Sequence, residues 1–398
     1  MIARGVPLLL QNALRRSARG ACSAVAAVVA MLASIGPAAA QSPPPADWTA
    51  KLKRDLAAID RQQRARLGVH VRDLDTGASV SHRADQRWYL ASMVKVPIAI
   101  AVMRGVEQGQ YGLDTRLTLR ASDLVDGAGT TQLAPVGSSL AIRTLLEQMI
   151  VHSDNTATDM LIGLVGLAEV NALVRSLVPE GLQRITTLGE VRRLVYGNLV
   201  PGVERLTGND LLLLRHARSD AERLQILHQL VDVPEARRLV PTVDAAYDAY
   251  YASGLNSGRL DAYADLLAML ADGKALSASS TEYLLGVMER VATGTHRLMA
   301  GLPKTARLAH KTGTQRRRVC DGGLVRWREA GGERRAVVVA CTRDEASLER
   351  AEWTLMQVGL ALCRSGLMTS GVADASSCPA PPALSLRQPG AVPASPRR

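Results

Sequence analysis

Strand-like patterns occur near both ends of this chain, and helical patterns fill the region between them. Residues 68–74 and 78–82 alternate apolar and polar side chains around the turn Asp75-Thr76-Gly77, which predicts a β-hairpin. Three runs near the other end have the same strand character: residues 305–314, 318–327 and 335–342. Because antiparallel strands from the two ends of a chain can pair, we expect them to form one sheet.

Apolar side chains at helical spacing predict a helix over residues 48–66 and another over residues 345–364. Further helices are expected between the two strand regions: 92–107, 142–151, 154–165, 167–176, 209–216, 220–231, 259–272 and 277–292. Residues 123–135 form a polar, glycine-containing loop. The expected fold class is therefore α+β: an antiparallel sheet with terminal helices, plus an all-helical lobe. We expect the active site between sheet and lobe, since clefts form at such junctions.

Both termini have the composition of segments outside the folded domain. Residues 1–40 combine arginines, a short apolar run and Ala38-Ala39-Ala40, the pattern of a cleaved signal peptide, which leaves no stable membrane span. Residues 41–47 are rich in proline and read as a linker. Residues 366–398 are rich in Ala, Pro and Ser and are expected to be a disordered tail. The protein is expected in the periplasm or outside the cell.

Charge and residue composition limit the kinds of molecule that this chain is expected to bind. The net charge is +11, but four of the positive charges are arginines in the first forty residues. The chain shows no basic stripe with interleaved aromatic residues, so we expect no nucleic acid partner. No His, Asp and Glu side chains have the spacing of metal ligands, so we expect no metal and no cofactor. We expect a monomer.

Cysteine usage is compatible with disulfides in an oxidising compartment. Removal of the signal would leave four cysteines, which allow three pairings that the sequence cannot distinguish: Cys320, Cys341, Cys363 and Cys378. Cys320 and Cys341 lie in apolar strand-like runs, so the alternative is that they are buried small hydrophobic residues.

Ser92-Met93-Val94-Lys95 opens an apolar helical run, and residues three apart lie on one helix face. A serine hydroxyl becomes a good nucleophile only when a base takes its proton, and a lysine with a lowered pKa is such a base. Free backbone N–H groups at a helix start would stabilise an oxyanion there. Taken alone, the motif also fits an exposed lysine on an ordinary helix.

Two later motifs add to the first. Ser153-Asp154-Asn155 stands between two expected helices, where it is either a plain helix cap or a catalytic turn. In the catalytic reading, Ser153 relays a proton and Asn155 binds a substrate amide. Lys311-Thr312-Gly313-Thr314 lies on an expected strand, with Lys311 on one side and Thr312 and Thr314 on the other. The alternative is an exposed lysine before a strand bend.

In this order, the three motifs resemble those of the penicillin-recognising serine hydrolases, and within them the class A β-lactamases. The resemblance covers about residues 50–198 and 256–365, and it implies one catalytic domain over 48–365. It implies Ser92 as the acylated nucleophile, Lys95 as the base and Ser153 as the relay. It also implies a set of substrate-binding residues: Asn155, Lys311, Thr312, Thr314 and Arg297, the last supporting a substrate carboxylate.

The sequence departs from that family at two places. Class A enzymes carry a glutamate and, four residues later, an asparagine that hold the deacylating water. Here Glu190 is in about the right place, but Leu194 occupies the asparagine position. The other reading of Glu190 is a solvated loop residue paired with Arg193. The segment 199–257 is longer than the corresponding segment of the family. This helical insertion either reshapes the cleft or packs on the outer face.

The resemblance implies a secreted serine β-lactamase-like hydrolase that opens the lactam ring through an acyl-enzyme on Ser92, with Glu190 activating the deacylating water. The substrate partner would be a small β-lactam or a peptidoglycan-derived peptide. A D,D-peptidase or another penicillin-binding serine hydrolase with slow β-lactam turnover is the first alternative. A non-catalytic sensor or structural module that has kept the motifs is the second.

Overall fold

The computed structural model describes residues 47–63, 65–234, 237–329, 331–368 and 378–380. The expected signal peptide and residues 41–46 of the expected linker lie outside these ranges. The main sheet has five antiparallel strands in the order β2 (Ser79–His82), β1 (Arg66–Asp73), β9 (Gly332–Arg343), β8 (Arg318–Glu329) and β7 (Arg307–Gln315). The two ends of the chain do pair in one sheet, because β1 lies beside β9 with Val69 opposite Ala340.

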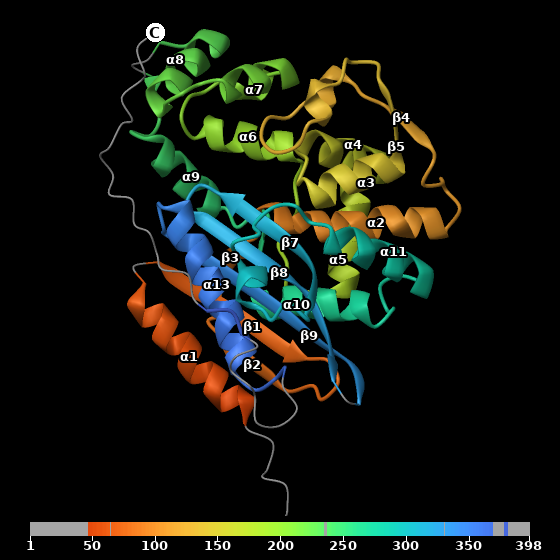
Figure 1. The fold of residues 1–398 in the computed structure, drawn as a ribbon. Coiled ribbons are helices and arrows are strands. Elements are labelled where there is room, and N and C mark those ends of the chain that lie inside the picture. Colours follow the sequence, from red (N-terminus) through yellow and green to blue (C-terminus); the bar gives the residue numbers. More distant parts are fainter. Residues whose placement is uncertain (1–46, 64, 235–236, 330, 369–377, 381–398) are drawn as a thin grey trace, which may run out of the picture. The chain divides into compact units, whose positions relative to one another are not determined.

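Two terminal helices cover one face of this sheet, α1 (Trp48–Gln62) and α13 (Leu348–Arg364) (Figure 1). Leu52 and Leu56 of α1, one helical turn apart, are fully buried in a shared core with Val69 and Val338 of the sheet. This core needs one apolar stripe from each helix and alternate residues from each strand. The expected α+β fold with terminal helices on the sheet is confirmed.

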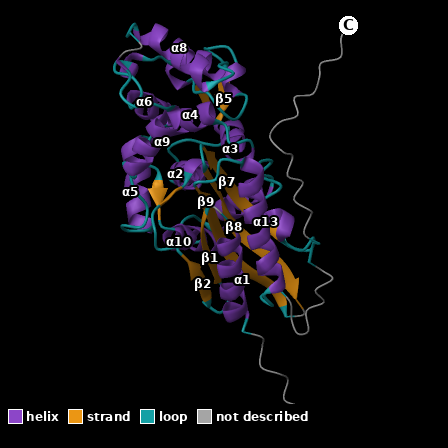
Figure 2. Ribbon diagram, turned by 90° about the vertical axis from the view of Figure 1, so that its left-hand side faces the viewer, coloured by secondary structure: helices purple, strands orange, loops and turns teal. Residues whose placement is uncertain are grey.

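Helices of the other layer cover the opposite face, as Figure 2 shows from the side. They include α2 (Lys95–Glu107), α10 (Leu260–Ala271) and α11 (Ala278–Glu289). Helix α2 is apolar on almost every side, which is typical of a helix buried all round. The helices that pack around it complete the lobe: α3 (Ile142–Val151), α4 (Asn155–Val165) and α5 (Leu167–Leu177).

A separate apolar core joins α6 (Leu188–Gly197) to three helices of the insertion: α7 (Gly208–Arg215), α8 (Asp220–Val231) and α9 (Val243–Ala252). Tyr89 and Ala91, which directly precede the Ser92 motif, belong to the same core. The insertion is therefore packed against the segment that leads into Ser92. Helices α6 and α9 were not expected from the sequence, whereas α3 and α8 have the expected bounds.

The remaining elements are short. They are β3 (Trp88–Tyr89) paired with β6 (Ser257–Gly258), β4 (Arg116–Thr118) paired with β5 (Ser139–Ala141), the helix α12 (Leu298–Gly301), and the 3-10 turns η1 (Ala91–Val94), η2 (Ala121–Asp123), η3 (Thr131–Leu133) and η4 (Val203–Arg205).

The four cysteines within the described residues form two disulfides, Cys320–Cys341 and Cys363–Cys378. The first joins β8 to β9 at directly opposite positions, so the reading of these two residues as unpaired hydrophobic cysteines is wrong. The second ties α13 to Cys378, which lies within the segment expected to be disordered. Residues 366–368 and 378–380 of that segment are described, and the rest lies outside the described ranges.

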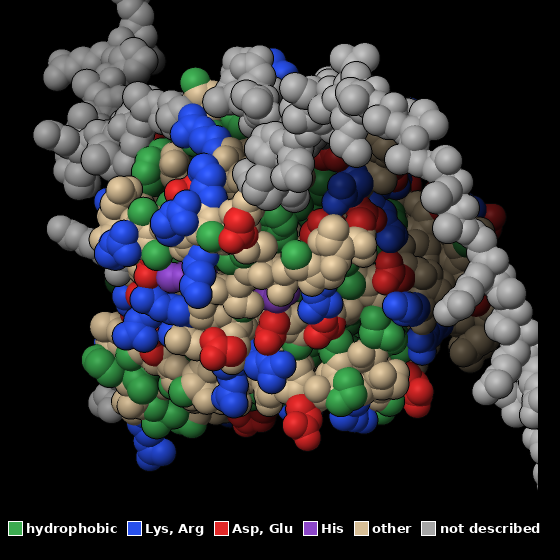
Figure 3. All heavy atoms as spheres, turned by 90° about the horizontal axis from the view of Figure 1, so that it is seen from below, with side chains coloured by type: hydrophobic (Ala, Val, Ile, Leu, Met, Phe, Trp, Pro, Cys, Tyr) green, Lys and Arg blue, Asp and Glu red, His purple; other side chains and the backbone are tan. Residues whose placement is uncertain are grey.

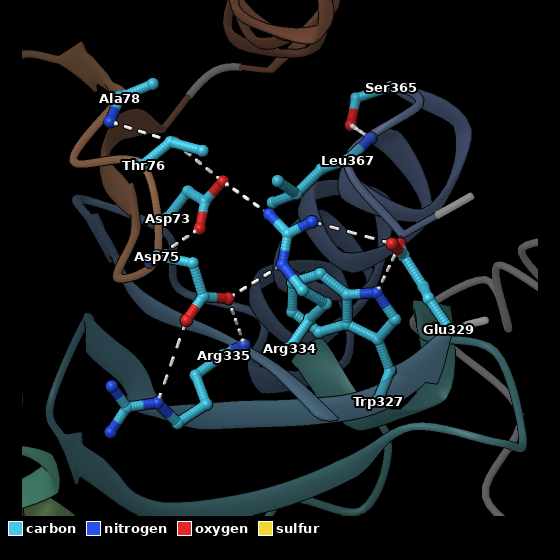
Figure 4. Close-up of polar contacts among 10 residues, drawn as sticks. All are labelled: Asp73, Asp75, Thr76, Ala78, Trp327, Glu329, Arg334, Arg335, Ser365 and Leu367. Carbon is cyan, nitrogen blue, oxygen red and sulfur yellow. Dashed lines mark hydrogen bonds and ion pairs between the residues drawn. The ribbon is translucent and has the colours of Figure 1, made fainter. Parts of the chain in front are cut away.

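A cluster of charged side chains surrounds Arg334 near the start of β9 (Figure 4). Its guanidinium donates to Asp75 Oδ2 at 2.7 Å and to Asp73 Oδ2 at 3.0 Å, and it lies 3.5 Å from Glu329 Oε2. These contacts tie the β8–β9 hairpin to the turn after β1.

Surface charge is mixed on the face drawn in Figure 3, where Lys and Arg side chains lie among Asp and Glu side chains. Among the helices within the described ranges, none is long and apolar enough to cross a membrane alone. Helices α4 and α5 meet that criterion by length and composition only when taken together across an 86° bend.

Candidate active site

Ser92 lies in η1, which leads directly into α2 and packs against β7 and β8. A Cβ atom at Gly313 would lie only 2.3 Å from the carbonyl oxygen of Leu90, so glycine is required for β7 to pass this close. Ala91, just before the serine, has a φ of 48°, a region that residues other than glycine rarely adopt. Such strain is found at functional sites that the surrounding structure holds in place.

Lys95 is completely buried on the first turn of α2. Its Nζ atom donates to the Ser153 carbonyl at 2.5 Å, to Asn155 Oδ1 at 2.8 Å and to Ser153 Oγ at 3.2 Å. Burial lowers the pKa of Lys95 to about 7, with Arg192 adding to the effect and Asp154 and Asp159 opposing it. A lysine with this pKa is partly a free amine at neutral pH, as general-base work requires.

The Ser153-Asp154-Asn155 turn lies between α3 and α4, where Asp154 caps α4 by accepting from Ala157 N at 2.8 Å. Its second oxygen accepts from two backbone N–H groups, Thr130 and Thr131, each at 2.8 Å. Asp154 is therefore both a helix cap and the anchor of the loop that covers this turn. Ser153 has a φ of 58°, so the motif holds a second residue in the left-handed region.

Asn155 is placed by its amide group, whose oxygen accepts from Lys95. The amide nitrogen donates to the carbonyl of Asp126 at 2.7 Å. Because a carboxamide nitrogen carries two hydrogens, one of them remains for a substrate. The structure thus brings Lys95, Ser153 and Asn155 together as the motifs suggested.

Strand β7 presents its residues to two sides. Lys311 is completely buried, and its Nζ donates to the Thr312 carbonyl at 3.1 Å. Burial holds the pKa of Lys311 well below its usual value, and the nearby charges of Lys95 and Arg297 add to this effect while Asp321 opposes it. Thr312 Oγ1 lies 2.5 Å from Thr293 Oγ1. Since β7 is an edge strand of the sheet, its outer side is not paired within that sheet.

Arg297 lies under the end of β7 and is only 3% exposed. Its guanidinium donates to Thr314 Oγ1 at 2.7 Å, and also to the carbonyls of Cys320 at 2.9 Å and Gly313 at 3.2 Å. Glu352 of α13 accepts from its Nε at 3.2 Å. Arg297 thus supports the strand and orients the Thr314 hydroxyl, which keeps its own hydrogen to donate.

Glu190 lies in the first turn of α6. Its carboxylate lies 3.3 Å from Arg184 Nη2, not against Arg193, whose Nε donates to Leu206. The Glu190 side chain is 33% exposed, and Leu194, four residues later on the same helix face, is 36% exposed. Both positions of the expected deacylation pair are thus partly exposed, and the side chains that Lys95 hydrogen-bonds are those of Ser153 and Asn155.

Two further residues near the site were missed by sequence reasoning, Arg192 and Asp126. Arg192 Nε donates to Asp126 Oδ1 at 2.5 Å, and the Asp126 carbonyl is the group that Asn155 binds. A helical projection of residues 188–197 would have put Arg192 opposite Glu190, but that helix was not expected. Elsewhere in the described residues, no three His, Cys, Asp or Glu side chains gather to hold a metal ion.

Comparison with known proteins places the chain in a family. The family model described as "Beta-lactamase enzyme family" matches residues 51–365, so this chain belongs to the beta-lactamase enzyme family. It is 35% identical over 160 residues to Beta-lactamase L2 of Stenotrophomonas maltophilia, which covers 40% of this chain and 52% of that protein. It is 30% identical over 165 residues to a beta-lactamase of Streptomyces cellulosae, with 41% and 53% covered. The chain thus spans about half the length of the curated relatives it matches.

Solved structures with the same fold are similar over nearly their whole length. PBP-A is 25% identical with a TM-score of 0.58, covering 80% of this chain and 96% of PBP-A. A PBP-A mutant solved as an acyl-enzyme complex with penicillin G gives the same identity and score, with 81% and 98% covered. A beta-lactamase from Sphaerobacter thermophilus, 24% identical with a TM-score of 0.59 and 81% and 98% covered, shows the fold alone.

Proposed function

We propose that this protein is a serine hydrolase that opens β-lactam rings through an acyl-enzyme on Ser92. The observation that carries the proposal is the buried Lys95 amine, held within hydrogen-bonding distance of both Ser153 and Asn155 and with its pKa lowered to about 7. A buried base beside a serine at a helix start is the arrangement that nucleophilic catalysis needs. Family membership supports the same reaction class.

In the proposed reaction, the neutral Lys95 amine takes the proton of Ser92 while the serine oxygen attacks the lactam carbonyl. Backbone N–H groups of Ser92 and Thr314 stabilise the developing oxyanion. Ser153 then passes its hydroxyl proton to the leaving nitrogen and takes one from the Lys95 ammonium, whose Nζ donates to Ser153 Oγ at 3.2 Å, so that Lys95 is neutral again. The products of this step are the ring-opened ester on Ser92 and a neutral amine in the substrate.

Substrate binding is proposed to depend on a carboxylate beside the scissile amide. Lys311 and Arg297 supply positive charge, and Thr312 and Thr314 supply hydroxyl donors. Thr314 is the most accessible of the four, while Arg297 acts from below through the hydrogen bond to its hydroxyl. Asn155 offers its remaining N–H to the substrate's amide oxygen.

A second candidate is a D,D-peptidase or related penicillin-binding hydrolase that releases β-lactams slowly. Two observations favour it: Leu194 stands where class A enzymes carry the asparagine that helps to hold the deacylating water, and Glu190 is paired with Arg184. The role of Glu190 as deacylating base stays a prediction. The PBP-A mutant captured with penicillin G is a similar protein in which the acyl-enzyme was stable enough to be solved.

Incubation of the purified protein with a chromogenic cephalosporin, followed by intact-protein mass spectrometry, separates these candidates. Continuous turnover supports the β-lactamase, and a stoichiometric burst with a lasting adduct supports the penicillin-binding hydrolase. The Ser92→Ala variant must show no adduct. An adduct of the expected mass on that variant, or none on the wild type, would overturn the proposal and leave a non-catalytic module.

The Glu190→Gln variant tests deacylation separately. If Glu190 activates the water, this variant acylates normally and then accumulates the adduct, with kcat and KM falling together. If Glu190 acts only at the surface, turnover matches the wild type. The Arg184→Gln variant, which removes the partner of Glu190, is the control for loss of the surface pair.

We further propose that the protein acts as a monomer in the periplasm or outside the cell, on small β-lactams or peptidoglycan-derived peptides. Export is supported by the composition of residues 1–40. Cell fractionation with an antibody to the folded domain would test it, and recovery of the uncleaved chain from the cytoplasm would count against it.

A further inference from the structure

Helix α6 presents different residues to the site and to the solvent. Two residues subtend about 200° on an α-helix, so Arg192 projects almost opposite to Glu190. Arg192 shares its stripe with Leu188, four residues earlier, which packs against the core of the helical lobe. The ion that α6 turns toward the Lys95 cluster is therefore the cation Arg192, whose side chain is only 13% exposed.

Arg192 reaches Lys95 through a continuous series of polar contacts. Its Nε donates to Asp126 Oδ1 at 2.5 Å. The Asp126 carbonyl accepts from Asn155 Nδ2 at 2.7 Å, and Asn155 Oδ1 accepts from Lys95 Nζ at 2.8 Å. A Cβ atom at Gly127 would lie 2.4 Å from Asn155 Nδ2 and 3.3 Å from Arg192 Nη2, so this residue fits closely against both.

The loop that carries Asp126 is fixed at both ends by the residues around the Ser153 turn. Val125 N donates to Thr156 Oγ1 at 3.0 Å on one side, and Asp154 binds the backbone of Thr130 and Thr131 on the other. Between these anchors, the ion pair with Arg192 is the contact that reaches the loop from α6. Fixing Asp126 fixes the carbonyl that orients Asn155.

Lys95 is surrounded by charges of both signs. Asp154 precedes α4, Asp159 lies on α4, Arg192 projects from α6 and Lys311 lies on β7. Burial raises the pKa of Asp159 to about 6, although its oxygens accept from Leu188 N at 2.7 Å and Gly189 N at 2.9 Å. Asp126 balances Arg192, so removing either partner changes the net charge beside the amine in an opposite sense.

We propose that Arg192 and Asp126 form a positioning pair that holds Asn155, and through it the Lys95 amine, in place for general-base work. The inference rests on the proposed function in that the base is the one that would activate Ser92. It adds two residues to the machinery, and it gives a role to the cation that α6 places beside Asn155.

The test measures the protonation of Lys95 in three variants, by ¹³C NMR titration of the lysine side chains and by the pH profile of penicillin acylation. Arg192→Gln leaves Asp126 unbalanced, so Lys95 titrates higher, by on the order of one pH unit, and the acid limb of acylation moves to higher pH. Asp126→Asn leaves Arg192 unbalanced and moves both to lower pH. Arg193→Gln, the neighbouring arginine on the same helix, leaves both unchanged.

Opposite shifts of the Lys95 titration, together with a loss of acylation rate at high pH in both variants, support the pair. A wild-type rate at high pH, or an unmoved Lys95 titration in both variants, would overturn it. Arg192→Lys keeps the charge and should titrate close to wild type, which separates charge from simple unfolding. NMR needs no substrate, so shifts without any acylation would reject the proposed function while leaving the pair intact. If Arg192→Gln does not fold, the downward shift in Asp126→Asn still decides the matter.

Discussion

At the scale of single residues, Lys95 carries the largest consequence. A lysine side chain ordinarily loses its proton near pH 10.5, and burial here lowers that pKa to about 7. Removing water from an ammonium group disfavours the charged form, and the three oxygens around Nζ offset that loss only in part. The loss of hydration makes the charged form of Lys95 unfavourable, and the same loss lowers its pKa into the range where a free amine is present at neutral pH.

This pKa predicts the pH dependence of acylation. Since only the neutral amine can accept the serine proton, the rate should rise with pH through about 7 and level off above it. Stopped-flow acylation with a penicillin from pH 5 to 9 measures the limb. The Lys95→Met variant should lose it together with a factor on the order of 10² or more in rate. A rate that stays level from pH 5 to 9 would instead point to a carboxylate base.

Arg297 illustrates a residue whose role depends on what it supports. Its guanidinium donates hydrogen bonds to Glu352, two carbonyls and the Thr314 hydroxyl, and Arg297 is 3% exposed. We expect Arg297→Ala to raise KM for penicillins about tenfold, since the oriented hydroxyl and a positive charge are both lost. A penicillin ester should show a much smaller change. Equal effects on acid and ester would remove Arg297 from carboxylate recognition, and Arg290→Ala, a surface arginine paired with Glu147, is the control.

At the scale of elements, helices α8 and α9 of the insertion form hydrogen bonds and ion pairs with the turn that follows β7. Arg316 Nη2 donates to Asp220 Oδ2 of α8 at 2.7 Å, and its Nε bonds Asp244 of α9. Tyr251 of α9 donates its hydroxyl to the Arg316 carbonyl at 2.8 Å, and the Arg318 guanidinium lies 4.5 Å from the centre of the same tyrosine ring. With Tyr89 and Ala91 in the insertion's core, these contacts link it to both sides of Ser92.

Loss of the Arg316 contacts should loosen β7 and the turn that follows it. We expect Arg316→Ala to lower the free energy of unfolding by roughly 1–3 kcal/mol, as for the loss of hydrogen bonds to charged groups. Amide hydrogen exchange should quicken at residues 313–318, and KM should rise more than kcat falls. Arg143→Ala, which breaks an exposed pair with Asp114, is the matched control and should change neither. Unchanged exchange in the turn would show that the insertion only covers an outer face.

At the scale of the whole described domain, the sheet is stabilised by a covalent cross-link between two strands as well as by its apolar core. Cys320 and Cys341 join β8 to β9 across 21 residues of sequence. Cross-linking a loop of this length restricts the unfolded chain, which stabilises the fold by about 3 kcal/mol in the chain-entropy view.

The double variant Cys320→Ala/Cys341→Ala should therefore have a free energy of unfolding that is lower by about this amount. Its urea unfolding midpoint should fall accordingly. Adding reductant should then destabilise the wild type much more than this variant, whose remaining disulfide is Cys363–Cys378. Equal sensitivity of the two proteins to reductant would mean that the β8–β9 bond contributes little. Because the Cys320 carbonyl also accepts from Arg297, acylation should be measured alongside unfolding.

The sequence by itself determined the sheet, most helices and the three motifs of the candidate site. Strand alternation and helical spacing are local signals, and Ser92, Lys95 and Ser153 lie in short segments with fixed geometry. Lys311 and Thr312 could likewise be assigned to opposite sides of their strand, because side chains alternate along any strand.

Only the tertiary structure decided which way α6 faces and how the cysteines pair. Residues 188–197 carry one apolar stripe at Val191 and Val195 that packs on the insertion and another contact at Leu188 that packs on the lobe. A helix that packs between two apolar cores has its orientation fixed by both of them. The sequence of the helix alone does not reveal which segments form those cores. That orientation leaves Glu190 partly exposed beside Arg184 and buries most of Arg192 against Asp126, and it follows from packing between segments far apart in the chain.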